Sequence, residues 1–224
     1  MPITTCIFDA YGTLFDVNGA ARMAAQDTPA LAAVWPKLAT DWRAKQLQYT
    51  WLRAITGAHD DFWQVTQDGL DWAMEASGLD DPVLRNRLLA LYRELPAYDE
   101  VPAMLDAVKA AGMNTAILSN GSPDMLEAAA ASADLTLDAL LSVETVGIYK
   151  PDARVYDLVG QHFGCAKDEV LFVSSNGWDA AGATGYGFQT AWVNRAGDPI
   201  DRMPWKPKTV LTDLTSIPEL AAKI

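Results

Sequence analysis

The sequence places a carboxylate directly after a short apolar run near its start. Residues 3 to 8 form the run, Asp9 follows, and Gly12 comes three residues later. We expect the run to be a buried β-strand and Gly12 to supply the freedom for a tight turn. A carboxylate at the carboxyl end of such a strand lies where open α/β sheets place their ligands. It can act as a nucleophile, forming an ester that water later hydrolyses. Aspartate is also common in turns, so this stretch alone leaves both roles open for Asp9.

Polar side chains also follow later apolar runs, and one lysine directly precedes a proline and a predicted helix. The carboxyl ends of parallel strands meet at one edge of a sheet, so these side chains could converge on one site. Taken alone, each residue could have a purely structural role, as a turn former, a surface lysine or an acid in the first turn of a helix. Their convergence indicates the site. The set is Asp9, Ser119, Asn120, Lys150, Ser174, Asn176 and Asp179.

The elements that would position these residues alternate between strand and helix from about residue 98 onward. Apolar runs predict strands at 115–118, 140–143, 170–173 and 189–193, with a last short strand beginning at Val210; intervening helices are predicted at 101–111 and 152–163. Such alternation is typical of a parallel sheet covered by helices. The predicted fold class is therefore α/β, with a Rossmann-like parallel sheet core, helices on both faces and an inserted helical cap. Residues 198–208, which include three prolines, are expected to form a surface loop.

The residues between the first strand and the second predict helices with no convincing strand. The predicted helices span 40–55, 62–77 and 82–95. We expect two domains: a Rossmann-like core of residues 1–15 and 98–224, and a helical cap of residues 16–97. The cap would lie over the carboxyl edge of the sheet, with a cleft between the two parts.

The helix predicted over 40–55 rests on an apolar stripe. Leu47, Trp51 and Ile55 recur at four-residue spacing, and Trp42 and Leu52 widen the stripe. Arg43 lies on the same face, where an arginine either extends its head to solvent or lines a pocket. The sequence of the helix leaves both open. The block is rich in tryptophan, and core packing is the expected role for most of its members, Trp35, Trp42, Trp51, Trp63 and Trp72.

Composition restricts the class of partner. The formal net charge of −12 disfavours nucleic acid and anionic membranes, which require a cationic face. An anionic substrate would need a few locally focused cations near Asp9.

No apolar run approaches the ~18 residues of a membrane span, and no charged and apolar leader precedes the first strand. Two cysteines, Cys6 and Cys165, are too few for a disulfide framework. We expect a reduced, cytoplasmic protein.

Together, four motifs resemble a known family. They are Phe8-Asp9-Ala10-Tyr11-Gly12-Thr13-Leu14, Ser119-Asn120-Gly121, Tyr149-Lys150-Pro151 and Ser174-Ser175-Asn176-Gly177-Trp178-Asp179. This combination is similar to the haloacid dehalogenase superfamily, and more narrowly to the type II L-2-haloacid dehalogenases. The stretch from Trp42 to Tyr49 also resembles that subfamily, and the resemblance covers nearly the whole chain.

The resemblance implies a role for each reacting residue. Asp9 would attack the halogen-bearing carbon, Thr13 would position it, Lys150 would pair with it, and Tyr156 would line the site. Ser174, Asn176 and Asp179 would organise the water that hydrolyses the ester, with Asp179 as the activating base. An ionised carboxylate, kept so by a nearby lysine, suits this displacement, and a second carboxylate suits activation of the water.

The resemblance also implies the substrate contacts. Ser119 and the main-chain N–H groups after Asp9 would hold the substrate carboxylate. Arg43 and Asn120 would receive the halide, with Phe62 beside it, as preorganised donors for the developing charge. The remaining residues expected to bind substrate are Ala10, Tyr11, Leu47 and Trp178. No cofactor and no metal is expected. A homodimer is implied because members of the family are commonly dimeric.

The expected activity is hydrolysis of L-2-haloalkanoic acids to D-2-hydroxyalkanoic acids, through an aspartyl ester with inversion at C2. Two alternatives stay open. One is a Mg²⁺-dependent phosphatase of the same superfamily, which would carry an acid at position 11, where this chain has Tyr11 with an ordinary pKa of roughly 10. It would also use a further acid near Ser174–Asn176 to hold the metal. The other is a binding module that has lost its activity.

Overall fold

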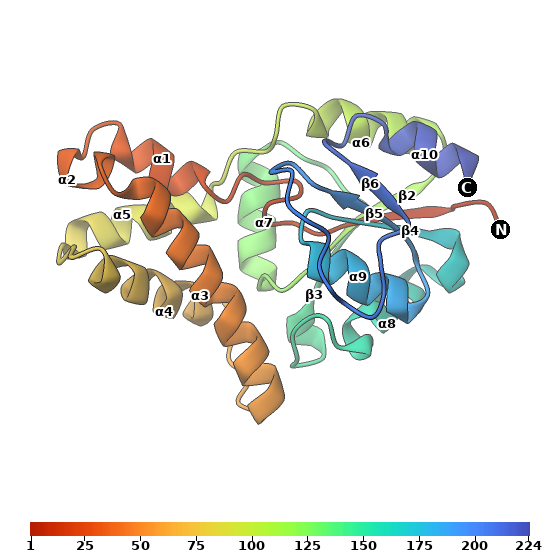
Figure 1. Cartoon of the computed structure of the whole chain (residues 1–224). Coiled ribbons are helices and arrows are strands. Elements are labelled where there is room, and N and C mark those ends of the chain that lie inside the picture. Colours follow the sequence, from red (N-terminus) through yellow and green to blue (C-terminus); the bar gives the residue numbers. More distant parts are fainter.

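The structure is a computed structural model that describes residues 1–224. Six strands form one sheet with the order β3-β2-β1-β4-β5-β6 (Figure 1). Their bounds are β1 Thr5–Phe8, β2 Asn114–Ser119, β3 Ala139–Ser142, β4 Val170–Ser174, β5 Gln189–Val193 and β6 Thr209–Leu211. Every neighbouring pair is parallel. In β1, Phe8 is paired with Ile117 on one side and Val173 on the other. Asp9 therefore leaves the sheet at its centre, between the ends of β2 and β4.

Helices cover both faces of the sheet, which confirms the predicted α/β class. α6 (Val101–Ala110) and α10 (Ile217–Lys223) lie together on one face, and α8 (Ala153–Phe163) and α9 (Gly177–Tyr186) lie on the other (Figure 1). The remaining elements of this part are α7 (Pro123–Ser132) and two single 3₁₀ turns, η1 (Val143–Thr145) and η2 (Lys167–Glu169). The predicted surface loop is also found, since no helix or strand occurs between β5 and β6. No helix in the chain is both long and apolar enough to cross a lipid bilayer.

Five helices lie between β1 and α6, to one side of the sheet (Figure 1). They are α1 (Gly19–Ala25), α2 (Pro29–Ala32), α3 (Trp35–Thr56), α4 (Phe62–Ala76) and α5 (Pro82–Arg93). The two chain segments that join them to the sheet run side by side: Asp16 N donates to Pro96 O at 2.9 Å, and Tyr98 N donates to Leu14 O at 3.0 Å. Residues 14–16 and 96–98 are thus tied together where the helical block begins and ends.

The apolar stripe that predicted α3 is not the buried face of that helix, so this detail of the prediction is wrong. The residues of α3 that are buried are Leu38, Ala39, Trp42, Gln46 and Thr50. Ile55 is 82% exposed and Leu52 is 50% exposed. Two of the buried residues are polar, and they find hydrogen-bond partners inside the block. A pattern of apolar residues alone misplaces the buried face of this helix.

The expected core role is confirmed for three of the five tryptophans in the helical block. Trp42 is buried in the core, and Trp35 and Trp63 are partly buried and pack against it. Trp63 packs under the guanidinium of Arg93, and Trp72, which is 39% exposed, packs under Lys45. Cations over aromatic faces stabilise such half-exposed rings. Trp51 meets Trp178 edge to face across the boundary with the sheet domain, with ring centroids 5.3 Å apart.

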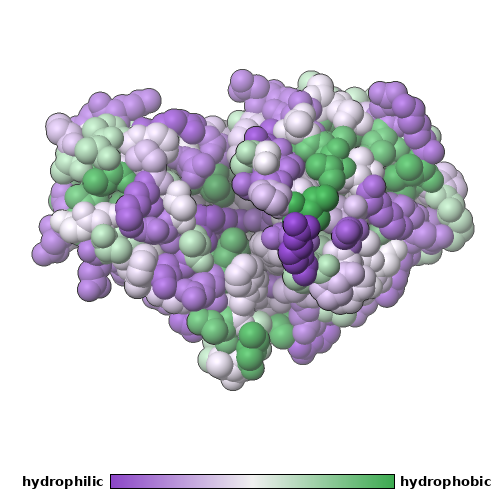
Figure 2. All heavy atoms as spheres, in the orientation of Figure 1, coloured by the Kyte–Doolittle hydropathy of each residue, from purple (hydrophilic) through white to green (hydrophobic).

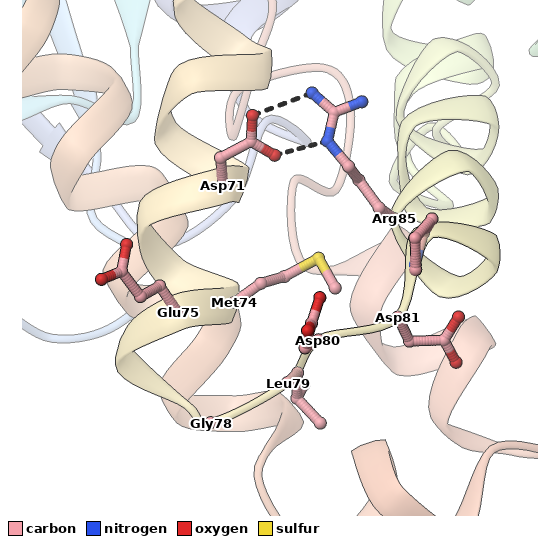
Figure 3. A pocket seen from close by; sticks show the side chains of 9 residues that line it. Asp71, Met74, Glu75, Gly78, Leu79, Asp80, Asp81 and Arg85 are labelled. Atoms are coloured by element: carbon pink, nitrogen blue, oxygen red, sulfur yellow. Dashed lines mark hydrogen bonds and ion pairs between the residues drawn. The ribbon is translucent and has the colours of Figure 1, made fainter.

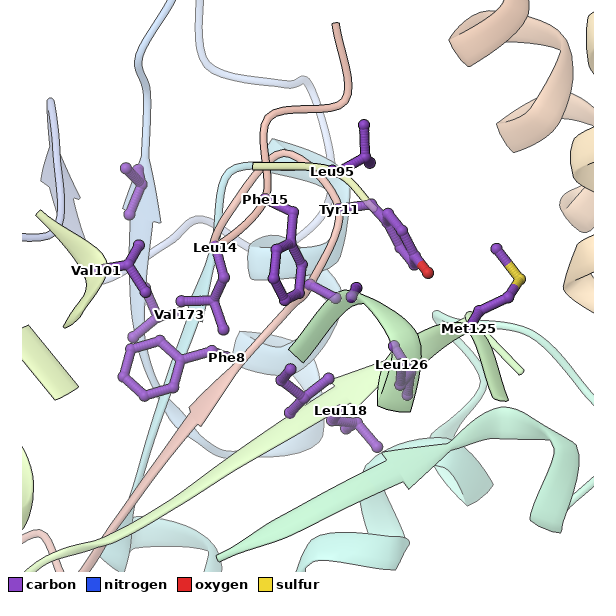
Figure 4. Packing of buried hydrophobic residues seen from close by; sticks show 14 of the residues in the cluster. Phe8, Tyr11, Leu14, Phe15, Leu95, Val101, Leu118, Met125, Leu126 and Val173 are labelled. Atoms are coloured by element: carbon purple, nitrogen blue, oxygen red, sulfur yellow. The ribbon is translucent and has the colours of Figure 1, made fainter. Parts of the chain in front are cut away.

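A continuous apolar core joins the sheet to the loop after β1. Phe8, Leu118 and Val173 from three adjacent strands pack with Leu14 and Phe15 of that loop (Figure 4). All five are fully buried. The loop that follows the nucleophile candidate is therefore held from below by the same side chains that hold the sheet together.

Gly12 has a backbone conformation that other residues adopt at a cost, with φ of 90°. A Cβ there would lie 2.9 Å from Ser175 Oγ. Gly112 also has positive φ, 79°, but a Cβ there would meet nothing within 4 Å. We expect Gly112→Ala to lower the free energy of unfolding by about 1–2 kcal/mol, the cost of the left-handed conformation. Gly12→Ala should cost more, because Ser175 must also move. Urea denaturation of both variants measures the difference, and equal losses would contradict the role given to Ser175.

Candidate active site

Asp9 lies at the centre of a hydrogen-bonded cluster. Its Oδ2 accepts from Thr13 Oγ1 at 3.1 Å and from Asn176 Nδ2 at 2.9 Å, and its Oδ1 lies 3.2 Å from Lys150 Nζ. The residue is only 6% exposed. A buried carboxylate is tolerated when charged and neutral donors surround it, as they do here. Oδ2 is fixed by two neutral donors, whereas Oδ1 has a single contact and keeps a lone pair free.

Lys150 lies between two carboxylates. Its Nζ lies 2.8 Å from Asp179 Oδ2 as well as 3.2 Å from Asp9 Oδ1, and the side chain is 1% exposed. Burial opposes the charged ammonium, but Asp179 and Asp9 together outweigh it and raise the pKa of Lys150 above its ordinary value. The ammonium is therefore retained in the interior.

Asp179 is fully buried on the far side of Lys150. Its second oxygen, Oδ1, accepts a hydrogen bond from the hydroxyl of Tyr156 at 2.8 Å. Burial raises the pKa of Asp179, Lys150 opposes this change, and the charge of Asp9 adds to it. Tyr156 lies beneath Asp179, and burial raises its own pKa well above 10, so it acts as a donor.

Arg43 reaches this cluster from α3. Its Nη2 donates to the carbonyl of Tyr11 at 3.2 Å and to Asn176 Oδ1 at 3.3 Å. No acidic side chain forms an ion pair with it. Arg43 therefore turns toward the cluster rather than extending to solvent, and it brings a positive charge without an acidic partner to the edge of the sheet.

The predicted polar residues at the ends of β2 and β4 shape the turns there. Ser119 Oγ accepts from Gly121 N at 3.1 Å, and Ser174 Oγ accepts from Asn176 N at 3.1 Å. Asn120 Oδ1 accepts from the main-chain N–H of Lys150 at 3.1 Å. These three side chains are buried, and none of them forms a hydrogen bond to Asp9. The main-chain N–H groups of Ala10 and Tyr11 form none of the main-chain hydrogen bonds found in the loops and turns.

Apolar predicted residues border the cluster. The ring of Tyr11 lies 5.7 Å from that of Phe62 on α4, and Ala10 is fully buried. Leu47 and Trp178, together with Asn176, line a cavity of about 540 Å³ between α3 and the loop after β5. Trp178 also lines a second, mainly apolar cavity of about 540 Å³ that includes Trp51, Tyr149 and Lys150. The predicted residues thus form a buried charged cluster with a polar side at Asn176 and an apolar side at Phe62 and Trp178.

Sequence reasoning missed several residues next to this cluster. Ser175 N donates to Thr13 Oγ1 at 2.8 Å, and Gln46 Oε1 accepts from Arg43 Nη1 at 2.8 Å. His59 Nε2 lies 2.9 Å from Glu144 Oε2, which links the helical block to the sheet domain. Gln46 comes one turn after Arg43 but lies outside the apolar stripe read from the sequence, so that stripe does not indicate its burial. The sequence around His59 and Glu144 does not indicate their pairing either.

A separate hollow lies between α4 and α5, away from Asp9. It has a volume of about 540 Å³ and is lined by Asp71, Met74, Glu75 and Asp80 among others, with Arg85 paired to Asp71 (Figure 3). No predicted site residue lines it. The chain also has no group of three or more His, Cys, Asp and Glu side chains arranged to hold a metal ion.

Residues 3–187 match the haloacid dehalogenase-like hydrolase family. The chain belongs to this family. Over its full length it is 43% identical to (S)-2-haloacid dehalogenase 1 of Pseudomonas sp. strain CBS-3, of which it covers 98%. It is 42% identical over 95% of its length to the (S)-2-haloacid dehalogenase of Pseudomonas sp. strain YL, covering 92% of that protein. The L-2-haloacid dehalogenase of Xanthobacter autotrophicus, solved with chloropropionic acid covalently bound, superposes with a TM-score of 0.88 at 34% identity over 99% of each chain. These relatives confirm the superfamily and subfamily that the four motifs predict.

The ion triad of this dehalogenase-family chain allows a stability test. Lys150→Met leaves Asp9 and Asp179 buried without their cation, so we expect the free energy of unfolding to fall by about 3–5 kcal/mol at neutral pH. Lys37→Met is the matched control, since Lys37 is 65% exposed and its ion pair contributes about 1 kcal/mol or less. Urea denaturation measures both.

The same variant should respond to pH. Burial and the charge of Asp9 raise the pKa of Asp179 while Lys150 lowers it, so in Lys150→Met this pKa should rise further and the folded variant should gain more stability than the wild type as pH falls. The deficit of Lys150→Met relative to the wild type should therefore shrink between pH 7 and about pH 5. A deficit that grows with acidity would contradict this arrangement of charges.

Proposed function

We propose that this protein hydrolyses L-2-haloalkanoic acids to D-2-hydroxyalkanoic acids through an ester formed on Asp9. The observation that supports it most strongly is a buried carboxylate whose Oδ2 is held by Thr13 and Asn176 and whose Oδ1 contacts only Lys150, with the cation Arg43 linked to it through Asn176. A carboxylate so placed can attack carbon directly, and a nearby cation without an acidic partner suits a departing anion.

In the first step Asp9 Oδ1 attacks C2 of the substrate and the carbon–halogen bond breaks with its electron pair leaving on the halide. Attack comes from the side opposite the halogen, which inverts the configuration at C2. Thr13 and Asn176 hold Oδ2 and so orient the attacking atom. The ammonium of Lys150, 3.2 Å from Oδ1, holds this oxygen in place until the ester forms.

The anionic parts of the substrate need donors. Arg43 and Asn120 would receive the halide, with Phe62 beside it. Ser119 and the main-chain N–H groups of Ala10 and Tyr11 would hold the substrate carboxylate. The two N–H groups make no hydrogen bond to another loop or turn, which fits donors reserved for a ligand. The alkyl part would lie against Leu47 and Trp178.

In the second step a water attacks the carboxyl carbon of Asp9, which releases the hydroxyacid and restores the carboxylate. Asp179 would accept the proton of that water, and its raised pKa suits a base better than an ordinary aspartate would. Ser174 and Asn176 would position the water. Cleavage at the carboxyl carbon leaves C2 untouched, so the single inversion of the first step is kept.

The phosphatase alternative fits the site less well. A Mg²⁺ site in such an enzyme is built from carboxylates and a substrate phosphate. Here the ammonium of Lys150 already lies between the two carboxylates, Asp9 and Asp179, and Asn176 stands beside them. Burial raises the pKa of Tyr11 well above 10, which makes it a poor acid for a leaving alcohol.

We also propose that residues 16–97 act as a cap, because they contribute Arg43, Leu47 and Phe62 to the proposed substrate site.

A cytoplasmic location is proposed because Cys6 and Cys165 are both free. A homodimer is proposed because α3 exposes Leu52 and Ile55, and Figure 2 shows apolar side chains gathered at the lower tip of the molecule. Sedimentation velocity distinguishes a dimer from a monomer.

Halide release from racemic 2-chloropropionate tests the proposed reaction. In the presence of EDTA, release should stop at half conversion, since only the L enantiomer reacts, and chiral chromatography should find the D-hydroxyacid. Asp9→Asn should abolish release while its near-ultraviolet circular dichroism stays that of the wild type. Formation of the L-hydroxyacid, or full activity of Asp9→Asn, would contradict the mechanism. Release of phosphate from p-nitrophenyl phosphate with Mg²⁺, without halide release, would favour the phosphatase.

A further inference from the structure

Gln46 is a buried amide behind Arg43. It lies on α3 one turn after that residue and is 1% exposed. A buried amide is costly unless its donors and acceptor are satisfied. The close approach of α4 provides for this: a Cβ on Gly69 would lie only 3.2 Å from Gln46 N, so α4 can pack close enough for its side chains to reach the amide.

The neighbours of Gln46 determine which way its amide points. Thr66 Oγ1 donates its proton to Phe62 O at 2.7 Å, so toward Gln46 it can only accept, and Nε2 lies 2.7 Å from it. A guanidinium can only donate, so the atom 2.8 Å from Arg43 Nη1 must be the amide oxygen. The hydroxyl of Tyr92 lies 3.1 Å from Nε2 and 3.2 Å from Oε1. The orientation is thus fixed from both ends.

This amide leaves the charge of Arg43 intact. A carboxylate at the same position would orient the guanidinium equally well but would neutralise it. Gln46 offers a neutral acceptor, and no acidic side chain pairs with Arg43 elsewhere. The other nitrogen, Nη2, is held by Tyr11 O and Asn176 Oδ1. Three neutral oxygens therefore orient the guanidinium while its positive charge remains available.

Tyr92 extends the network to the loop that carries the nucleophile. Its ring stacks on that of Tyr11 with centroids 5.5 Å apart and an interplanar angle of 18°. Tyr11 in turn accepts from Arg43 through its carbonyl. The amide of Gln46 is consequently fixed relative to the loop after Asp9, and Arg43 is fixed with it.

We propose that Gln46 is a positioning residue that aims Arg43 at the departing halide and, by being neutral, preserves the charge that stabilises it. This inference rests on the proposed function, in which Arg43 receives the halide. Gln46 itself touches no reacting atom. Its loss should therefore be felt most by the poorer leaving group, because chloride depends more than bromide on stabilisation as it departs.

The test compares single-turnover release of halide from L-2-chloropropionate and L-2-bromopropionate. Gln46→Met keeps the volume but removes the acceptor, so chloride release should fall on the order of tenfold, the scale of losing a partner that orients a functional side chain. Bromide release should fall less, and the bromide-to-chloride ratio should rise. Gln46→Glu, which keeps the shape and the acceptor but adds a charge, should raise the ratio too and serves if Gln46→Met does not fold.

Thr66→Val is the matched control. It removes the hydrogen bond at the other end of the amide while leaving the contact of Gln46 with Arg43, so the ratio should stay that of the wild type. A wild-type ratio in the folded, active Gln46 variants would overturn the inference and leave the proposed function standing. An equal rise in Thr66→Val would also overturn it, since it would indicate a general packing effect. A wild type that releases no halide would instead overturn the proposed function and this inference with it.

Discussion

The ion triad of Lys150 with Asp9 and Asp179 is the interaction on which the rest of the site depends. Two carboxylates buried this close together would repel each other, and only a cation between them makes both tolerable. The sheet supplies the geometry: β1 delivers Asp9, β4 and the start of α9 deliver Asp179, and the turn before α8 delivers Lys150. The proposed nucleophile and the proposed base are thus held in fixed relation by one ammonium group.

Positive charge is scarce in this chain, and its placement is selective. The net charge is −12, yet Lys150 is buried and Arg43 lacks an acidic partner, while many other basic side chains pair with acids on the surface. A single anionic substrate can be held by such a site without a generally cationic face, because charges act strongly over short distances in a buried environment. Gln46 also keeps positive charge available at the site, since it orients Arg43 without neutralising it.

Much of the sheet domain was predictable, because its signals are local. Apolar runs followed by polar turns located β1, β2, β4 and β5, and the parallel order then brought Asp9, Asn176 and Asp179 to one edge. The helical block was less predictable. Its buried face contains Gln46, whose amide finds partners on α4 and α5, and Thr50, whose hydroxyl donates to Leu47 O within α3. Two of its tryptophans, Trp63 and Trp72, are covered by cations. Contacts such as that of His59 with Glu144 join segments far apart in the chain, and the residues around neither partner indicate the pairing.

The central claim is that Asp9 becomes esterified, and oxygen labelling tests it most directly. The protein is allowed to turn over L-2-chloropropionate many times in H₂¹⁸O, and the peptide that contains Asp9 is then analysed by mass spectrometry. The account predicts ¹⁸O in the carboxylate of Asp9, and unlabelled hydroxyacid when enzyme exceeds substrate in a single turnover. Labelled hydroxyacid in that single turnover, with Asp9 unlabelled, would show that water attacks C2 directly and would contradict the account.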